Sequence, residues 1–180
     1  MHSFDGHNDV LLRLWRKAPD AVAAFLDGDG KGQLDLPRAV AGYMAGGLYA
    51  IFVPSESKKP AVVPIAAVPY DVPVPLAPEM SHAQRATLEM ASLLFRIAER
   101  SDGRVRIARS VAEIRAAKAA GAHAAVLHIE GCEALDSDLA FLDVLFAAGL
   151  RSLGPVWSRS NIFGHGVPFR FPSSPDTGDG

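Results

Sequence analysis

The sequence predicts an α/β fold built around a parallel sheet. Short apolar runs alternate along the chain with longer amphipathic segments, and glycine or proline follows several of them. Alternation of this kind indicates β-α-β units, in which strands pair in parallel and helices cover the sheet. The 180 residues are enough for one domain with a sizeable core. The five predicted strands are residues 4–9, 48–53, 105–108, 124–130 and 150–157.

The N-terminal part of the chain contains the first two strands. Residues 4–9 lead into a helical or looped stretch, and a glycine-rich polar loop follows at 27–33. The strand at 48–53 is rich in β-branched and aromatic residues and ends at Pro54. Seven of the thirteen prolines lie within 54–80, so we expect an extended loop there rather than a helix.

Three helices are predicted in the second half of the chain, each with a start or stop signal. A serine followed three residues later by Gln or Glu has the spacing of a capping box, and glycine commonly follows a helix. The helices are 81–100 with a Ser81–Gln84 capping box, about 111–120 with a Ser110–Glu113 box and Gly121, and about 138–148, which ends at Gly149.

Composition and charge exclude several classes of protein. The formal net charge of −2 lacks the basic excess of a nucleic-acid-binding protein, so no nucleic-acid partner is expected. No apolar run approaches the roughly 20 residues of a membrane span, and no basic region followed by an apolar run marks a secretory signal. Cys132 is the single cysteine, which excludes an internal disulfide and favours a reducing compartment. We therefore expect a cytoplasmic protein without a membrane segment.

The strongest local signal for chemistry is His7-Asn8-Asp9 near the end of the first predicted strand. Side chains at i and i+2 share one face of a strand, so His7 and Asp9 would project together while Asn8 points away. An imidazole nitrogen beside a carboxylate oxygen suits zinc, and ligands bind at the carboxyl ends of parallel strands. The alternative is a hydrogen-bonded His–Asp pair that stiffens a turn. Asp5, before Gly6, is expected to shape a turn.

A second signal is Glu130, which ends the apolar strand at 124–130. A carboxylate buried there without a partner would be costly, so it needs a cation, a metal or solvent. A carboxylate between two cations can give one oxygen to each and hold the ions about 3.5–4 Å apart. The alternative is a solvent-facing glutamate at a helix start. His128 would share the face of Glu130, and we interpret it as a structural histidine rather than a ligand.

The glycine-rich loop at 27–33 resembles the start of a calcium-binding loop, with Asp27 and Asp29 in place. Lys31 occupies the third ligand position, and Arg38 stands where the bidentate glutamate should be. Two cations at ligand positions exclude that chemistry, so we interpret the segment as a flexible polar loop.

Six segments, taken in order, carry a resemblance to known proteins. They are Asp5-Gly6-His7-Asn8-Asp9, Gly32-Gln33-Leu34-Asp35-Leu36-Pro37-Arg38, Gly46-Gly47-Leu48-Tyr49-Ala50-Ile51-Phe52-Val53-Pro54, His128-Ile129-Glu130-Gly131, Gly149-Leu150-Arg151-Ser152-Leu153, and Asn161. Together they resemble the membrane dipeptidase family, also called renal dipeptidase or peptidase family M19. The resemblance extends across nearly the whole chain.

The resemblance implies a (β/α)₈ TIM-type barrel of the metallo-dependent hydrolase kind, of which about five of the eight strands are present here. It implies two zinc ions in a complete site, with His7 and Asp9 as metal ligands and Glu130 as the carboxylate that bridges the ions. It also implies hydrolysis of dipeptides, including those with a C-terminal D-residue, by a metal-bridging hydroxide. Trp157 stands where the family has a substrate-contacting histidine, and it is a candidate substrate-binding residue.

The resemblance also implies metal ligands that have no counterpart here, namely two histidines on later strands, with an acidic residue on a last strand. A complete barrel typically needs about 250 residues. We therefore expect residues 1–180 to be the N-terminal portion of one barrel domain, inactive alone, with 161–180 as a loop or disordered end. Two alternatives stay open. One is a non-catalytic barrel remnant or assembly partner, with a homodimer as one form. The other is a different metal-dependent amidohydrolase.

Overall fold

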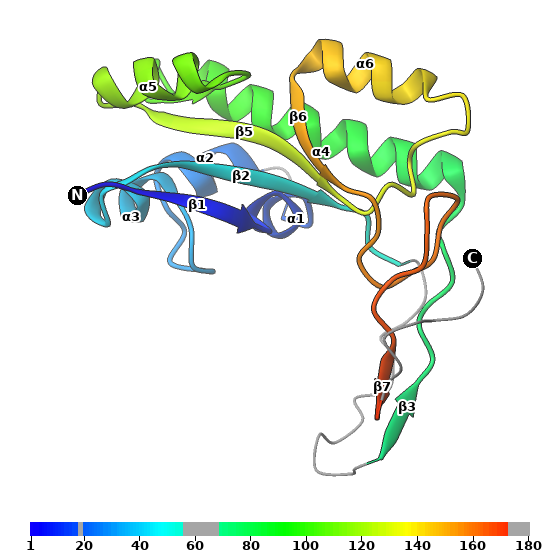
Figure 1. Cartoon of the computed structure of the whole chain (residues 1–180). Coiled ribbons are helices and arrows are strands. Elements are labelled where there is room, and N and C mark those ends of the chain that lie inside the picture. The colour runs from blue at the N-terminus through cyan, green and yellow to red at the C-terminus, as the bar shows by residue number, and fades with distance from the viewer. Residues whose placement is uncertain (18–19, 56–68, 173–180) are drawn as a thin grey trace.

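The computed structural model describes residues 1–17, 20–55 and 69–172. Its main feature is a five-stranded parallel sheet with helices packed against it, together with a two-stranded arm that projects from one end (Figure 1). The α/β class and the five strands of the main sheet confirm the prediction. These strands are β1 (Ser3–Asn8), β2 (Met44–Phe52), β4 (Val105–Ile107), β5 (His123–Glu130) and β6 (Leu150–Gly154).

β5 is the central strand of the sheet. Along one edge it pairs with β2, and β2 in turn pairs with β1. The other edge of β5 is shared, since β4 pairs with residues 123–125 and β6 with residues 127–130. Because all four pairings are parallel, the carboxyl ends of the strands point toward the same end of the sheet.

Six helices accompany the sheet in the described part of the chain, and the long fourth helix runs across it (Figure 1). They are α1 (Val10–Trp15), α2 (Ala21–Leu26), α3 (Leu36–Ala41), α4 (Met80–Arg100), α5 (Val111–Ala119) and α6 (Ala140–Ala148). Odd-numbered residues of β2 and β5, such as Tyr49 and Leu127, are buried in one core with α1, α2 and α4. Because side chains alternate along a strand, the even-numbered residues face the opposite side.

The predicted Ser81–Gln84 capping box is wrong. α4 begins at Met80 after Glu79, and no side chain caps its first turn. Ser81 is therefore already inside the helix, and the Gln84 amide donates to the carbonyl of Ala134 at 3.3 Å instead.

The other helix starts agree better with the sequence. The Ser110 hydroxyl accepts the backbone N–H of Glu113 at 3.2 Å, which confirms it as the N-cap of α5. The Glu113 carboxylate accepts the N–H of Arg109, one residue before the position that a capping box uses. α6 begins at Ala140, two residues after its predicted start, because the Asp136 carboxylate accepts the first free N–H groups of the helix.

Three strands of the sheet match their predicted bounds to within one residue at each end, whereas β2 and β6 differ by more. β2 begins at Met44 rather than 48, because Gly46 pairs in the ladder although glycine is usually disfavoured in strands. A side chain at Gly46 would meet the backbone of Ala124 on β5, so only glycine fits this close approach. β6 ends at Gly154 because Pro155, which follows, has no N–H to donate.

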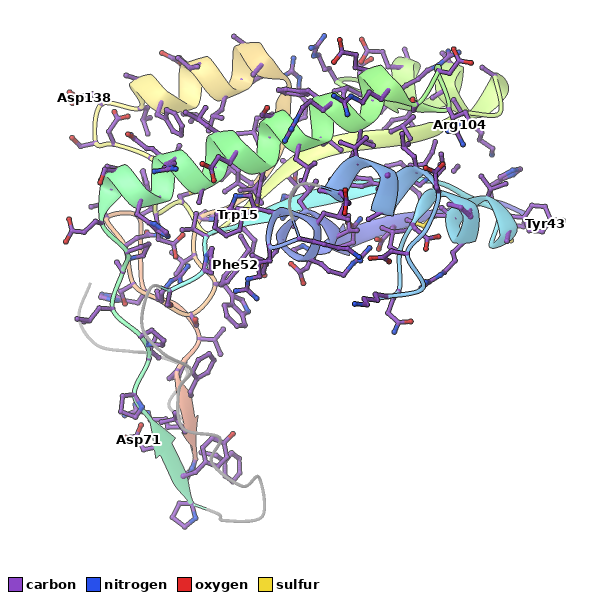
Figure 2. All side chains as sticks on the ribbon, turned by 180° about the vertical axis from the view of Figure 1, so that it is seen from behind. Trp15, Tyr43, Phe52, Asp71, Arg104 and Asp138 are labelled. Atoms are coloured by element: carbon purple, nitrogen blue, oxygen red, sulfur yellow. The ribbon has the colours of Figure 1, made fainter. Side chains whose placement is uncertain are left out.

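The projecting arm is a pair of short antiparallel strands, β3 (Tyr70–Val72) and β7 (Phe169–Phe171). The rings of Tyr70 and Phe171 stack with their centroids 6.4 Å apart. Figure 2 shows Asp71 on the arm, and shows Tyr43 and Phe52 at opposite ends of the sheet, with the arm on the side of Phe52. The arm therefore extends from the end of the sheet that carries the strands' carboxyl ends.

These two strands correct the expectation that 54–80 and 161–180 contain no regular element. Each strand has only three residues, too few for an alternating pattern to show in the sequence. Residues 56–68 and 173–180 of the predicted loops lie outside the described residues.

α2 and α3, which have six residues each, were not predicted from the sequence. Helices of this length offer less than two turns of periodicity, and tertiary packing rather than propensity stabilises them.

Across the described residues, none of the helices combines the length and the apolar character that a membrane crossing requires.

Candidate metal centre

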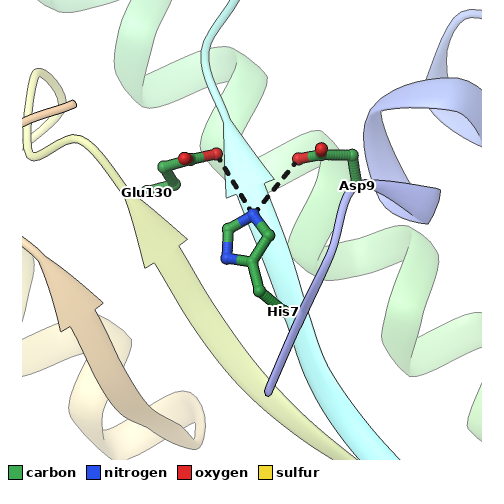
Figure 3. Close-up of side chains that lie close together, drawn as sticks. All are labelled: His7, Asp9 and Glu130. Carbon is green, nitrogen blue, oxygen red and sulfur yellow. Dashed lines mark ion pairs between the residues drawn. The ribbon is translucent and has the colours of Figure 1, made fainter. Parts of the chain in front are cut away.

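His7, Asp9 and Glu130 come together at the carboxyl ends of β1 and β5 (Figure 3). The Nε2 atom of His7 lies 3.5 Å from Oδ1 of Asp9 and 3.3 Å from Oε2 of Glu130. The prediction that Asp9 lies on the first strand is wrong. Asp9 follows β1 as the N-cap residue of α1. Three potential ligand atoms, one from each residue, lie within 4.8 Å of one another, and this is the one such His/Cys/Asp/Glu group among the residues described.

A β-bulge in β1 determines the direction in which His7 points. Between two ladder pairs, Gly6 and His7 of β1 lie opposite the single residue Leu48 of β2. In unbroken pairing His7 would lie opposite Tyr49, whose side chain is fully buried in the helix-covered core. The extra residue shifts His7 to the other face of the sheet, where Glu130 lies.

Glu130 is the least exposed member of the cluster, with 23% of its side chain accessible against 38% for His7 and 61% for Asp9. Burial raises the pKa of the Glu130 carboxyl above its usual value, and the neighbouring His7 acts in the opposite direction. A carboxylate whose negative charge is partly desolvated gains from a nearby cation. The donor set, one imidazole nitrogen and two carboxylate groups, therefore fits a zinc ion.

His128 lies beside the cluster rather than in it. Its ring makes an edge contact with His7 at 5.3 Å between centroids, and its Nδ1 lies 2.9 Å from the hydroxyl of Ser152. Burial, followed by the proximity of His7, lowers the pKa of His128. Its interpretation as a structural histidine stays a prediction, with the Ser152 contact in its favour.

Trp157, the candidate substrate-binding residue, belongs to an aromatic group between the sheet and the arm. Its ring makes edge contacts with Phe52 at 5.4 Å and Phe169 at 5.9 Å, and the residue is 45% exposed. Phe52 pairs with Glu130 in the ladder between β2 and β5. The structure thus places Trp157 in contact with a neighbour of Glu130, outside the three-residue cluster.

A buried ion pair near the cluster was not found from the sequence. Arg159 Nη2 lies 2.8 Å from Glu133 Oε1, and Arg159 also donates to the Ser55 hydroxyl at 2.8 Å and to the Val53 carbonyl. These bonds connect the segment after β6 to the segments after β2 and β5. Because Arg159 and Ser55 are 104 residues apart in the chain, no local sequence signal could have paired them.

Asp29 in the glycine-rich loop is bound by cations of the chain itself. Its carboxylate lies 3.1 Å from Arg13 Nη1 and 2.5 Å from Lys17 Nζ. The hydrogen bond from Lys17, and then the backbone N–H of Lys31, hold the pKa of Asp29 well below its usual range. These contacts agree with the exclusion of calcium chemistry in this loop.

The fold and the cluster together define a class of protein. Histidine and carboxylate side chains that converge at the carboxyl ends of parallel strands can hold a metal ion next to a substrate. A parallel α/β sheet that carries such a cluster is typical of metal-dependent hydrolases.

Comparisons with known proteins agree with this class. The model of the family described as membrane dipeptidase (peptidase family M19) matches residues 1–174. A crystal structure of a metallopeptidase from Rhodobacter sphaeroides, liganded with a phosphinate mimic of the dipeptide L-Ala-D-Ala, is 45% identical, with a TM-score of 0.91. The crystal structure of dipeptidase AC, a metallopeptidase of family M19, is 46% identical, with a TM-score of 0.88. An uncharacterized protein in the PQQ-III 3′ region of Acinetobacter calcoaceticus is 39% identical over 184 residues.

The chain belongs to the membrane dipeptidase family, peptidase family M19. The solved structures match all of this chain but only 50% of dipeptidase AC and 52% of the Rhodobacter protein. The match to the Acinetobacter protein covers 98% of this chain and 55% of that protein. The chain therefore spans about half the length of these relatives, which agrees with the partial barrel predicted from the sequence.

Proposed function

We propose that the chain supplies part of a zinc-dependent dipeptidase site, in which His7 and Asp9 hold metal ions and Glu130 bridges two of them. The observation that carries this proposal is the convergence of His7, Asp9 and Glu130 in a chain of this family. Two bound zinc ions would lower the pKa of a water molecule and polarise the carbonyl of the scissile bond.

The chain's own side chains would contribute position and charge. The His7 ring stands between the two carboxylates and presents Nε2 to both (Figure 3). Glu130 comes from the central strand, and its carboxylate would offer one oxygen to each of two ions. Asp9 is 61% exposed, so this side of the cluster is open to a substrate.

The substrates that we propose are dipeptides, including those with a C-terminal D-residue. The bound mimic of L-Ala-D-Ala in the Rhodobacter neighbour supports this choice. Trp157 would contact the substrate through its exposed ring, which rests against Phe52 beside Glu130. An indole offers mainly apolar surface there, where a histidine would offer a hydrogen bond.

We further propose that these 180 residues alone show little or no dipeptidase turnover, because the described residues cluster only three candidate metal ligands. An assembly partner, or a homodimer, is the second proposal. It is favoured by the open edge of β1, which within the described residues pairs only with β2. The third is another metal-dependent amidohydrolase on the same fold.

Zinc titration of the metal-free protein by calorimetry tests the metal site. We expect the unmodified chain to bind zinc, and Glu130→Gln, which keeps the shape and removes the charge, to bind it at least about 10-fold more weakly. Glu99→Gln is the matched control, since Glu99 is exposed on α4, outside the cluster. Equal affinity of the Glu130 variant and the control would contradict the site.

Hydrolysis assays separate the remaining proposals. L-Ala-D-Ala, N-acetyl amino acids and lactones are incubated with the zinc-loaded chain, and its size in solution is measured in parallel. Robust turnover of the dipeptide would overturn the proposed inactivity, and turnover of another class alone would favour the amidohydrolase. A dimer without turnover would favour the assembly role.

A further inference from the structure

Asp5 and Asn8 form a hydrogen-bonded unit around the bulge that carries His7. The Asp5 carboxylate accepts the backbone N–H of His7 at 3.2 Å and the side-chain amide of Asn8 at 3.0 Å. The same Asn8 amide donates to the carbonyl of Leu48 on β2, also at 3.0 Å. The two side chains therefore bind both sides of the bulge, the histidine's own backbone and the strand opposite it.

The Leu48 contact has a specific consequence for pairing. Leu48 is the residue that two residues of β1 oppose, so the ladder is interrupted at its position. The Asn8 amide gives the Leu48 carbonyl a donor across that interruption. A shift of one residue to regular pairing would carry His7 to the opposite face of the sheet, because side chains alternate with a period of two.

The backbone around this unit leaves room for it. A side chain at Gly47 would come within 2.9 Å of the Asp5 Cβ and 3.3 Å of the Asn8 amide nitrogen. Glycine at this position of β2 is therefore what lets the two side chains fold back over the strand pair.

We propose that Asp5 and Asn8 are positioning residues for the metal site, because they lock the bulge that aims His7 Nε2 at Glu130. The inference rests on the proposed function for its metal, but the orientation of His7 is a property of the metal-free chain. Neither residue belongs to the ligand group itself.

Shape-conserving exchanges test the unit. In Asn8→Asp a carboxylate oxygen replaces the amide donor and faces two acceptors, the Asp5 carboxylate and the Leu48 carbonyl. In Asp5→Asn the new amide group faces the Asn8 amide, and the hydrogen bond between the two side chains is lost. The exchanged pair Asp5→Asn with Asn8→Asp restores a bond between the two side chains in the reverse direction and keeps the acceptor for His7, but leaves Leu48 without its donor.

The first measurement is zinc affinity, with Asp138→Asn as an exposed control for the loss of one carboxylate. We expect Asn8→Asp to weaken zinc binding about 10-fold or more, and the exchanged pair to recover part of that loss. Thermal unfolding of the same proteins identifies a general loss of stability. Folded single variants that bind zinc within about twofold of the unmodified chain would overturn the proposal.

The second measurement needs no metal. The rings of His7 and His128 are 5.3 Å apart between centroids, so an NMR cross-peak between their protons reports the orientation of His7. We expect this cross-peak in the unmodified chain and its loss in Asn8→Asp. If the unmodified chain binds no zinc, the proposed function fails while this cross-peak still decides the positioning role.

If the variants do not fold, hydrogen exchange in the unmodified chain still tests the proposal. The side-chain amide protons of Asn8 and the backbone amide of His7 should exchange slowly with solvent. The Asn8 amide donates to Asp5 and to the Leu48 carbonyl, and the His7 amide donates to Asp5. Exchange at the rate of an open loop would overturn the proposal without any substitution.

Discussion

Tyr49 and His123 form a buried polar pair at the amino end of β5. His123 Nδ1 lies 3.2 Å from the carbonyl of Met44, and its Nε2 lies 2.8 Å from the Tyr49 hydroxyl. A carbonyl only accepts, so Nδ1 carries the proton and Nε2 accepts from Tyr49. This arrangement needs a neutral imidazole, and burial lowers the pKa of His123 accordingly.

This pair predicts a pH dependence of stability. The unfolded chain protonates His123 near its ordinary pKa of about 6.5, whereas the folded chain protonates it only at lower pH. The free energy of unfolding should therefore fall as the pH drops below about 6.5 toward the folded pKa. Urea unfolding between pH 8 and pH 5 checks this, and His123→Gln, which accepts from Tyr49 but does not titrate, should lose less stability over that range. His165→Gln, at an exposed position, is the control. If the unfolding free energy of His123→Gln varies with pH as steeply as that of the unmodified chain, the prediction is contradicted.

The Arg159–Glu133 pair predicts a large asymmetry between single and double substitution. Arg159→Met leaves the buried Glu133 carboxylate without its cation and should cost about 3–5 kcal/mol of unfolding free energy. Adding Glu133→Gln removes the uncompensated charge and should recover part of the loss. Chemical denaturation of the three proteins measures the difference, and a double variant less stable than Arg159→Met would refute this account.

The residues of the site were predictable to different degrees. His7, Asp9 and Glu130 are polar groups at or next to the ends of apolar strands, and that contrast is visible in the sequence. The reason that His7 faces Glu130 is not visible, since it depends on a bulge between two strands. Arg159 was missed because its partners are distant in the chain, so their contact, like the bulge, depends on the folded arrangement.

At the level of elements, the two serines at predicted helix starts provide a matched comparison. Ser110 caps α5 and Ser81 lies within α4. Ser110→Ala should therefore lower the unfolding free energy by about 1 kcal/mol, whereas Ser81→Ala should change it little. Denaturant titrations of both variants check the pair, and equal effects would show that the hydroxyl of Ser110 has no capping role.

The contact between β2 and β5 predicts intolerance at one glycine. Gly46→Ala would place a methyl group against the backbone of Ala124 and the ring of Phe4, and should destabilise the fold by about 1–3 kcal/mol. Gly6→Ala, in open space on the neighbouring strand, is the control and should cost less. Thermal melts of both proteins give the comparison, and a larger loss in the control would contradict it.

The elements that the sequence predicts well are those that are long enough for their apolar pattern to be clear. α4 has 21 residues with a clear apolar stripe, and β5 contains the apolar run Ala124 to Leu127 and then Ile129 before Glu130. The start of β2 was missed because its two glycines resemble a loop, although the neighbouring strands approach too closely for any larger residue at Gly46. The arm strands were missed because each spans three residues.

At the level of the whole molecule, the parallel arrangement brings together residues that are far apart in the chain. Asp9 and Glu130 meet because every strand of the sheet runs the same way. The sequence alternation predicted this arrangement, but not that β4 and β6 would share one edge of β5. Edge sharing depends on strand length and offset, which periodicity does not encode.

The proposed site predicts that zinc stabilises the folded chain as a whole. A ligand that binds only the folded state raises the unfolding free energy by about 2.7 kcal/mol at 100 times its dissociation constant. The melting temperature should rise with zinc and return to its starting value with a chelator. Glu130→Gln should show a smaller rise at the same zinc concentration, and an identical rise would place the bound zinc elsewhere.

The cluster also has a mechanical consequence, because it reaches across an intervening strand. His7 belongs to β1, which pairs with one neighbour among the described residues, and Glu130 belongs to β5, which is held on both sides. An ion held by both side chains would act as a cross-brace over β2. Pulling on the N-terminus would then load β5 as well as the peripheral strand, so β1 could no longer peel away one hydrogen bond at a time.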